Sequence, residues 1–526
     1  MKRFLFVALI ALFTVVPAFS QDKAISAGKL FVSDEDFFVS NNIDVLLLES
    51  LRGKDIEPSP ICSDAVFIRR VFLDLIGTLP TSAEVQQFLK DKSPKKRAAL
   101  VDKLLAREEF VDYRTMKWCD LLRVKAEYPI NLWPNGALCY YNWIRDAVRT
   151  NKPYNVFVRE LLLSSGSNFR DGAANFYRAV QAKDAETLAE TVALTFLGQR
   201  IATWSDTRRA QLATFFSRVA YKETAEWKEE IVYWNREPLN DSNVTFPDGR
   251  KANVSPNTDP RRVFVDWLVS PNNKDFNRYI ANRIWFWMFG RGIVNEPDDF
   301  GDNNPPVHPA LLDYLADELV KSNYDMKHLY RLIACSSTYQ QSSLALKDNE
   351  RAETLFAVYQ IRRLDAEVLQ DAITQIFGAA SGYHSEVPEP FTNIPRRYRS
   401  IMLPDASVTS SFLEMFGRPT RDTGMESDRN SNVTESQQLF MINSTELNDM
   451  AKNLARGYRN RLNGRNQNER GVLLYDLWLR ILSRPPSAEE LLNVGKFFQN
   501  RSRSPEQAFQ DVIWTLVNTK EFQCRH

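Results

Sequence analysis

Apolar residues recur every three or four positions along most of this chain, a period that predicts amphipathic helices. In the first half, the pattern predicts helices over Asp34–Leu51, Cys62–Ile76, Pro153–Leu163, Ala185–Leu197 and Asp206–Val219. In the second half, it predicts helices over Arg261–Leu268, His308–Ser322, Lys327–Ser336, Leu355–Phe377, Thr434–Tyr458 and Glu469–Leu482. Strand-like alternation is confined to Ile231–Trp234 and Val244–Phe246. We therefore expect a mainly α fold.

A stretch without helical periodicity divides the chain. Residues 235–258 are rich in Pro, Asn, Asp and Gly, which is typical of a linker. Asp259 and Pro260 follow as a capping residue and a first-turn proline, which together begin a helix. The sequence predicts an N-terminal lead with one helix (21–61), a first helical domain (62–234), the linker (235–258) and a second helical domain with long irregular loops (259–526).

Two stretches near opposite ends of the chain resemble each other. Phe72–Val85 and Trp478–Leu491 align so that both contain a helix start of the form Pro-Ser/Thr-x-x-Glu, with Glu84 matching Glu490. The helices that follow both end in Glu-Phe, at Glu109-Phe110 and Glu521-Phe522. An N- and C-terminal helical pseudo-repeat explains this match, and so does convergent capping chemistry. If the match is a repeat, the two units should pack alike.

The N-terminus has the pattern of a secretory signal peptide. Lys2 and Arg3 precede an apolar run over Phe4–Val16, and small residues end at Ser20 before Gln21. We expect residues 1–20 to be cleaved and the protein to be exported to the periplasm or beyond. No later apolar run reaches the roughly 18 residues that a membrane helix needs, so no membrane span is expected in the mature chain.

Charge and composition exclude some classes of function. Lys and Arg number 67 and Asp and Glu number 66, a balance that argues against a nucleic-acid-binding protein. The four histidines are scattered, so no multi-histidine metal site is predicted and no metal ligand is assigned, although carboxylates of the acidic loop at Asp298 and Asp299 could bind a hard cation. The five cysteines contain no Cys-x-x-Cys pair, and isolated thiols are favoured over a specific disulfide.

The stretch Asn282–Pro309 is the best candidate for chemistry. An apolar helix breaks at a Gly-Arg-Gly sequence and is followed by an acidic loop with Asp298 and Asp299, and His308 precedes the next helix. Two carboxylates in different environments can divide acid and base roles, so these three residues are the candidate catalytic group. The alternative is structural, because Asp caps turns and helices.

Four arginines are candidates for binding an anionic or sugar ligand: Arg283, Arg291, Arg418 and Arg421. The planar guanidinium suits sulfate, carboxylate or phosphate. Arg283 lies on an otherwise apolar helix face, so the competing interpretation is an internal ion pair with a carboxylate. The loops that contain Arg418 and Arg421 also contain acidic residues, so a salt-bridged surface is the alternative there.

Several motifs resemble one known family. They are Arg69–Gly77, Leu79–Thr81, Asn282–Trp285, Phe289–Gly292, Asp298–Gly301, Asn304–Pro309, Arg363–Glu367 and Phe416–Pro419. The chain resembles the planctomycete-type, cytochrome-c-associated proteins with two consecutive domains of unknown function, numbered 1549 and 1553. The resemblance places the first domain at about Phe67–Val219 and the second at about Asp259–Phe498.

One departure from that family concerns its cofactor. The family is expected to carry Cys-x-x-Cys-His-x-His-Pro between a Phe-Leu-Gly and a Phe-Phe, which here are Phe196–Gly198 and Phe215-Phe216. The intervening residues 199–214 contain neither Cys nor His. Covalent haem needs both thioether cysteines and an axial histidine, and a zinc site needs the same kinds of ligand. We expect a member without a cofactor.

Three functions remain open at this point. The first is an exported, non-haem protein that binds a ligand, such as a glycan, or another exported protein in extracellular polymer metabolism. The second is a hydrolytic or redox enzyme centred on Asp298, Asp299 and His308. The third is a structural component of a surface assembly. The sequence does not decide whether the protein is an enzyme.

The expected loss of the cofactor can be tested directly. The mature chain from Gln21, produced in an oxidising compartment that attaches haem, should show no Soret band, because residues 199–214 offer no thioether cysteine. Elemental analysis of the same sample should find no stoichiometric metal. A covalent haem spectrum would contradict the interpretation of this segment.

Overall fold

Capping residues set the helix boundaries in the computed structural model, which describes residues 30–237, 239, 243–345, 351–387, 394–395, 398–463, 467–499 and 502–526. Ser63, Thr81, Asp184 and Asn273 each accept a backbone hydrogen bond at a helix start. Gly77, Gly198, Gly290 and Gly378 end four helices in the left-handed conformation. The predicted signal peptide, residues 1–20, lies outside the described residues.

The first half consists of α2 (Asn42–Leu51), α3 (Asp64–Ile76), α4 (Ser82–Lys90), α5 (Lys96–Leu105), α6 (Glu108–Leu121), α7 (Pro134–Arg149), α8 (Tyr154–Leu162), β1 (Gly166–Ser167), η2 (Gly172–Tyr177), α9 (Ala185–Leu197), η3 (Ile201–Thr203), α10 (Asp206–Thr214), β2 (Val219–Glu223), β3 (Glu230–Trp234), β4 (Asn243–Thr245) and β5 (Lys251–Asn253). The strands form a three-stranded antiparallel sheet, ordered β1-β3-β2, and the β4–β5 pair. Both predicted strands, at 231–234 and 244–246, are confirmed as β3 and β4.

The second half consists of α11 (Pro260–Leu268), α12 (Lys274–Phe289), α13 (Pro309–Lys321), α14 (Met326–Ala334), α15 (Ser337–Gln340), α16 (Arg351–Thr354), β6 (Arg362–Arg363), α17 (Ala366–Phe377), η4 (Ser400–Met402), α18 (Ser411–Met415), η5 (Glu426–Asp428), α19 (Glu435–Asn443), α20 (Thr445–Gly457), α21 (Arg459–Asn463), α22 (Gln467–Leu482), α23 (Ala488–Phe498), α24 (Pro505–Val517), α25 (Lys520–Gln523) and β7 (Cys524–Arg525). The mainly α fold is confirmed. Within the part that the structure describes, none of the helices is long and apolar enough to cross a bilayer.

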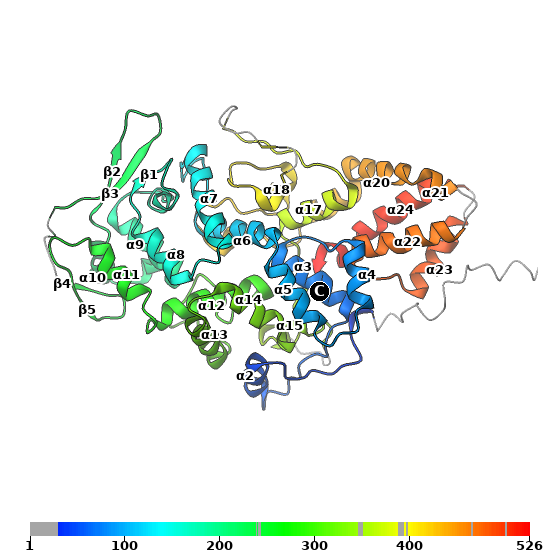
Figure 1. Ribbon diagram of the computed structural model, residues 1–526, viewed down its shortest axis with the longest axis horizontal. Helices are drawn as coiled ribbons and strands as arrows, with labels where there is room; N and C mark the ends of the chain where they lie inside the picture. Colours follow the sequence, from blue (N-terminus) through cyan, green and yellow to red (C-terminus); the bar gives the residue numbers. More distant parts are fainter. Residues whose placement is uncertain are drawn as a thin grey trace, which may run out of the picture.

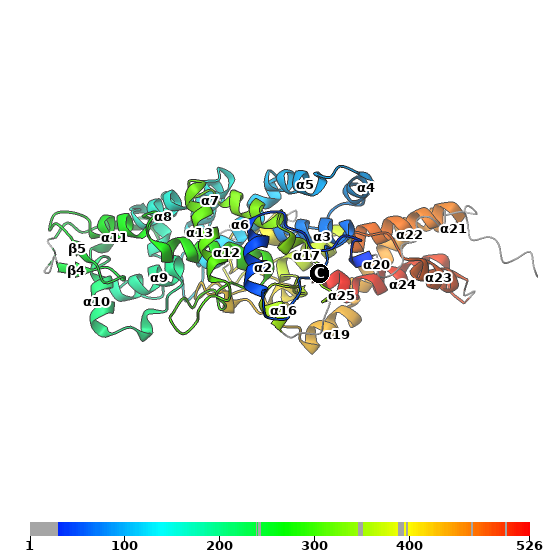
Figure 2. The same cartoon turned by 90° about the horizontal axis from the view of Figure 1, so that it is seen from below.

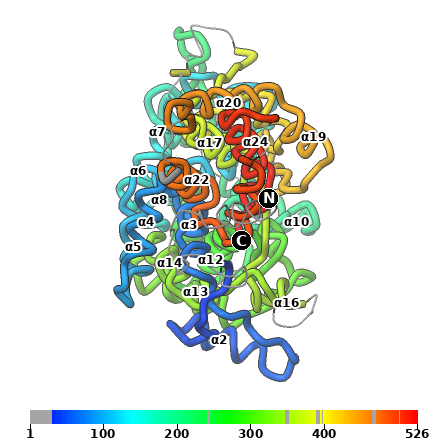
Figure 3. The backbone as a smooth tube through the Cα atoms, turned by 90° about the vertical axis from the view of Figure 1, so that its right-hand side faces the viewer, coloured from blue at the N-terminus to red at the C-terminus, as the bar shows by residue number. Residues whose placement is uncertain are grey.

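The molecule is elongated, and the chain crosses its centre several times. In Figure 1, α2–α5 lie near the middle, α8–α11 and β2–β5 form the left end, and α12–α14 return to the middle. The C-terminal helices α20–α24 form the right end, and Figure 2 shows the same order along the long axis. Viewed from the right-hand side, α20, α22 and α24 lie in front, and the C-terminus lies close to α3 (Figure 3).

Two clusters of buried apolar side chains form the core. The first extends from Ile43 to Tyr359 and also includes Leu479, whereas the second joins residues 364–522 to four residues of α3, α6 and the α3–α4 connection. The segment 235–258 contributes Val244, Ala252 and Val254 to the first cluster. The first cluster therefore continues across the segment that the sequence predicts as a linker, and the division into two domains there stays a prediction.

Helix α3 is the centre of the fold, because all of its residues except Asp64 are buried. Its Arg69 donates to the carbonyl oxygens of Ile481 (2.9 Å) and Phe522 (2.7 Å). Its Asp74 pairs with Arg362 of β6 (2.7 Å) and Arg525 of β7 (3.0 Å). The antiparallel pair β6–β7 therefore brings the C-terminal segment against a helix near the N-terminus.

The structure corrects two predicted helices. The predicted helix Leu355–Phe377 is wrong in its first half, because Arg362 and Arg363 lie in β6 and the helix begins only at Ala366. The predicted helix Thr434–Tyr458 is divided into α19 and α20, because Ser444 ends the first and caps the second. Apolar periodicity continues through both breaks, so periodicity alone could not locate them.

The two stretches that resemble each other have the same local structure. Glu84 and Glu490 complete capping boxes with Thr81 and Ser487, and the turn residues Gly77 and Ser483 have φ values of 61° and 60°. One arginine joins the two glutamates of each unit. Arg107 donates to Glu84 and Glu109, and Arg484 donates to Glu490 and Glu521. Arg107 follows the capping box of the first unit, whereas Arg484 precedes that of the second. This difference is compatible with a diverged repeat and with convergent capping chemistry.

The bridge at Arg484 should stabilise the C-terminal unit. Its side chain is 6% exposed, and it holds Glu490 at 2.7 Å and Glu521 at 2.6 Å. Arg484→Met should lower the free energy of unfolding by about 3 kcal/mol, because two partly buried carboxylates lose their cation. Urea denaturation followed by circular dichroism measures the loss.

The matched control is Arg331→Met, whose ion pair with Asp102 is about half exposed. It should change the stability by less than about 1 kcal/mol. Equal effects of the two substitutions would contradict a stabilising role for the buried bridge.

Candidate functional site

The three predicted catalytic residues do not converge. Asp298 is buried and forms an ion pair with Arg283, and its other oxygen accepts a hydrogen bond from the Glu426 backbone N–H (2.7 Å). Asp299, the next residue, is exposed. His308 contacts Ser50 and Leu355 instead. Among the described residues, no three His, Cys, Asp or Glu side chains lie together where they could hold a metal ion.

His308 is a buried residue at the N-terminus of α13. Its Nε2 lies 3.0 Å from the carbonyl oxygen of Leu355, which can only accept, so Nε2 carries the proton. Its Nδ1 then accepts from the Ser50 hydroxyl at 2.5 Å. Burial lowers the pKa of His308 below its usual value. Both ring nitrogens are therefore engaged within the protein, and a catalytic role for His308 stays a prediction.

Arg283 forms the internal ion pair that was the alternative to ligand binding. It contacts Asp298, the Tyr279 hydroxyl (2.8 Å) and Glu426 (3.5 Å). Burial alone would lower the pKa of Arg283, but the Asp298 carboxylate raises it above its usual value. Arg291 is half-buried, and its Nε has no hydrogen-bond partner among the described residues.

Arg421 lies in a second buried group of charges. Its Nε donates to the Asp120 carboxylate (2.8 Å). The guanidinium of Arg429 forms one ion pair with the same carboxylate and another with Glu367, both at 2.7 Å. Burial alone would raise the pKa of Asp120, but Arg429 and Arg421 hold it below its usual value. This group connects α6 to α17 and to the loop after α18, so its arginines already have carboxylate partners.

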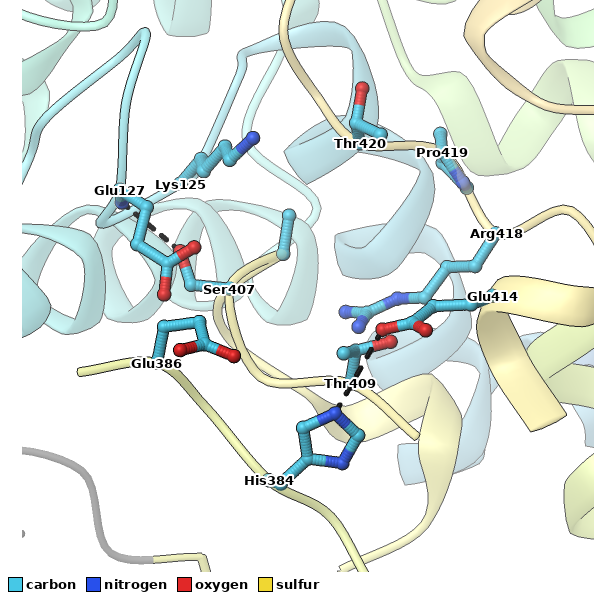
Figure 4. Close-up of a pocket in the computed structure, with 11 residues that line it drawn as sticks. Lys125, Glu127, His384, Glu386, Ser407, Thr409, Glu414, Arg418, Pro419 and Thr420 are labelled. Carbon is cyan, nitrogen blue, oxygen red and sulfur yellow. Dashed lines mark hydrogen bonds and ion pairs between the residues drawn. The ribbon is translucent and has the colours of Figure 1, made fainter. Parts of the chain in front are cut away.

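Arg418 is the one predicted binding residue that lines a pocket. The pocket has a volume of about 190 Å³ and is lined by Lys125, Glu127, His384, Glu386, Ala406, Ser407, Thr409, Glu414, Arg418, Pro419 and Thr420. These residues come from the loop after α6, the segment after α17, helix α18 and the loops on both sides of α18. Figure 4 shows Glu127 and Glu386 on one side of the pocket and Arg418 and Glu414 on the other.

Hydrogen bonds hold the walls of this pocket together. The backbone N–H of Glu127 donates to the Ser407 hydroxyl (3.0 Å), and His384 and Thr409 exchange two backbone hydrogen bonds of 2.9 Å. The His384 ring lies 3.9 Å from the Glu414 carboxylate, and both side chains are more than half exposed. The ammonium of Lys125 forms an ion pair with Asp422 (2.6 Å). The walls are therefore fixed, while several polar tips remain accessible.

Two charged groups in the pocket have shifted pKa values. Burial raises the pKa of Glu127, and the nearby Asp405 carboxylate adds to the shift. One Glu127 oxygen, Oε1, is buried without a hydrogen-bond partner among the described residues. Burial lowers the pKa of Arg418 to about 10, and Arg421 adds to this shift. The guanidinium of Arg418 donates to the carbonyl oxygens of Val408 and Asp405.

Sequence patterns do not identify most of this pocket. Glu127, His384 and Glu386 lie in loops of unremarkable composition, and no spacing connects them to Arg418. Only the basic character of the loop around Arg418 pointed to this region. A binding role for Arg283, Arg291, Arg418 and Arg421 stays a prediction.

Two family models match the chain in succession. Residues 42–211 match PSCyt2, a protein of unknown function (DUF1549), and residues 260–498 match PSD1, a protein of unknown function (DUF1553). The chain therefore belongs to the family of proteins that carry these two domains consecutively. No curated protein and no solved structure matches it.

The segment that lacks Cys and His in this chain does not fit a haem or zinc. Residues 199–214 form η3 and α10. The Arg208 guanidinium lies 3.6 Å from the Trp204 ring centre, and Arg209 pairs with Glu186 and Asp206. These side chains offer no thiolate or imidazole, the ligands that either group requires. The five cysteines of the chain are all free thiols.

Neighbouring carboxylates in the acidic loop allow a direct test of burial. Asp298→Asn should lower the free energy of unfolding by about 3 kcal/mol, because buried Arg283 would lose its closest carboxylate and keep only Glu426 at 3.5 Å. Asp299→Asn should change it by less than about 0.5 kcal/mol, because Asp299 is exposed. Urea denaturation measures both. Similar losses for the two variants would show that Asp298 is not an internal partner of Arg283.

Proposed function

We propose that this protein is exported and binds a sugar of an extracellular glycan in the pocket around Glu127 and Arg418. The observation that carries the proposal is the polar lining of this pocket, in which the carboxyl groups of Glu127, Glu386 and Glu414 surround a cavity of about 190 Å³. Carboxylate oxygens accept hydrogen bonds from the hydroxyl groups of a ligand.

The composition of the pocket supports a polyhydroxylated ligand. Its walls supply carboxylates, a guanidinium, an imidazole and the hydroxyls of Ser407, Thr409 and Thr420. Sugar hydroxyls both donate and accept, so they match such a mixture of groups. The volume of about 190 Å³ is below the roughly 300–1,000 Å³ of pockets for drug-sized ligands. This size supports a single sugar ring.

Export is part of the proposal because the ligand is extracellular. It is supported by the signal-peptide pattern of residues 1–20. The enzyme centred on Asp298, Asp299 and His308 has less support. Asp298 is already paired with Arg283, and both ring nitrogens of His308 are engaged.

Titration calorimetry with a panel of hexoses and hexosamines tests the proposal. A hexose of about 12 non-hydrogen atoms at about 0.3 kcal/mol each should bind with a dissociation constant on the order of 1 mM. Glu127→Ala should weaken binding about tenfold, because the acceptor is lost. Its backbone bond to Ser407 does not involve the substituted side chain.

The matched control is Glu446→Ala, an exposed glutamate on α20. It should leave the affinity unchanged. The proposal fails if no sugar of the panel binds at about ten times that concentration, or if Glu127→Ala binds as tightly as the native chain.

A further inference from the structure

Three aromatic side chains lie on the pocket loop 125–133 and on a turn that packs against this loop. Tyr128 is 81% exposed at the tip of the loop 125–133, Trp133 ends this loop, and Trp227 is 61% exposed on the turn between β2 and β3. The Trp133 and Trp227 ring centres lie 4.7 Å apart, with their planes at 73°. We call these three residues the aromatic platform. Large rings exposed together are uncommon on a soluble surface and mark binding sites.

A lysine completes the platform. The ammonium of Lys228 lies 5.6 Å from the centre of the Trp133 ring and 5.7 Å from that of the Trp227 ring. In the described part of the chain, no carboxylate lies within ion-pair distance of Lys228. The platform therefore offers apolar ring faces next to an unneutralised positive charge. The ammonium of Lys228 can pair with an anionic group of a ligand whose apolar face covers a neighbouring ring.

The backbone holds these side chains in costly conformations. Trp133 has φ 64° and ψ 149°, and Lys228 has φ 65°. Side chains other than glycine rarely adopt positive φ, and such residues gather at ligand sites. Backbone hydrogen bonds from Trp133 to Ala126 and from Leu132 to Lys125, both 3.2 Å, fix the loop. The two rings are thus positioned before any ligand arrives.

The platform and the pocket share one loop. Lys125 and Glu127 line the pocket (Figure 4), and the backbone N–H of Trp133 bonds to the intervening Ala126. Ala126 in turn donates its N–H to Asp405 (2.9 Å), beside the pocket residue Ser407. The loop 125–133 therefore carries residues of both the pocket and the aromatic platform.

We infer that the platform extends the pocket into a binding site for an acidic glycan chain, an inference that rests on the proposed sugar-binding function. The C–H face of a pyranose is apolar and covers an aromatic ring, while its hydroxyl edge stays solvated. Pyranose rings stack on Trp227 and Tyr128, and a carboxylate of the chain pairs with Lys228. The pocket holds one sugar of the same chain.

Two hexasaccharides that differ only at C6 test this inference: β-1,4-linked glucuronate and β-1,4-linked glucose. In titration calorimetry, the native chain should bind the glucuronate hexamer at least tenfold more tightly than glucuronic acid alone and more tightly than the glucose hexamer. Trp227→Ala should weaken binding of the glucuronate hexamer about tenfold. Phe38→Ala, which removes another exposed ring, should leave it unchanged.

Lys228 tests the charge separately. Lys228→Ala should abolish the preference for glucuronate over glucose, and Lys228→Arg should retain it, because only the charge is needed. These residues lie on an exposed turn, and thermal melts confirm that each variant folds. Equal affinity for the two hexamers in the native chain would overturn the acidic part of the inference. Binding of neither hexamer would overturn the glycan platform and favour a protein partner there.

The two proposals fail in different ways. If glucuronic acid alone does not bind but hexamer affinity depends on Trp227, the pocket is not a sugar site and the platform acts alone. If the single sugar binds and Trp227→Ala leaves hexamer affinity unchanged, the pocket proposal stands and the platform inference is wrong.

Discussion

The carboxylate of Asp74 is the point on which the fold depends. It is completely buried, and a buried charge is tolerated only when it is paired and hydrogen-bonded. One oxygen is paired with Arg362 and Arg525, and the other accepts from the hydroxyls of Tyr339 and Tyr359 at 2.8 Å each. Three segments far apart in the chain must therefore come together before this helix can be buried. The two core clusters meet around the same contact.

Much of the secondary structure follows from local rules. A capping box located the start of α4, and glycines located the ends of α3 and α12. The pairing of β6 with β7 could not be predicted from local sequence, because nothing around Arg362 indicates that a strand far along the chain will pair with it. Apolar periodicity therefore predicted a helix through β6. The apolar helix face around Arg283 indicated an internal ion pair, but the carboxylate partners of Arg421 and Arg429 come from distant segments and could not be predicted from the sequence.

The same limit applies to the candidate site. Asp298, Asp299 and His308 lie close in sequence, which predicted a shared site. In the structure, Asp298 pairs with Arg283 of α12, whereas His308 contacts Ser50 of α2 and Leu355. The pocket residues lie far apart in sequence, and folding brings them together. Of the predicted residues only Arg418 reaches that pocket. In this chain, ion pairs within the protein occupy most of the charged groups that looked available, and the accessible polar groups lie on loops.

The pairing of β6 with β7 has a consequence for how the chain is assembled. Arg525 donates to the hydroxyl of Tyr113, 412 residues earlier in the sequence. Contacts of such separation close large loops, and proteins rich in them fold slowly. Helix α3 is synthesised early, but its ion pair with Arg525 cannot form until β7 has been made. The order of synthesis is thus not the order in which the contacts at the centre of the molecule are completed.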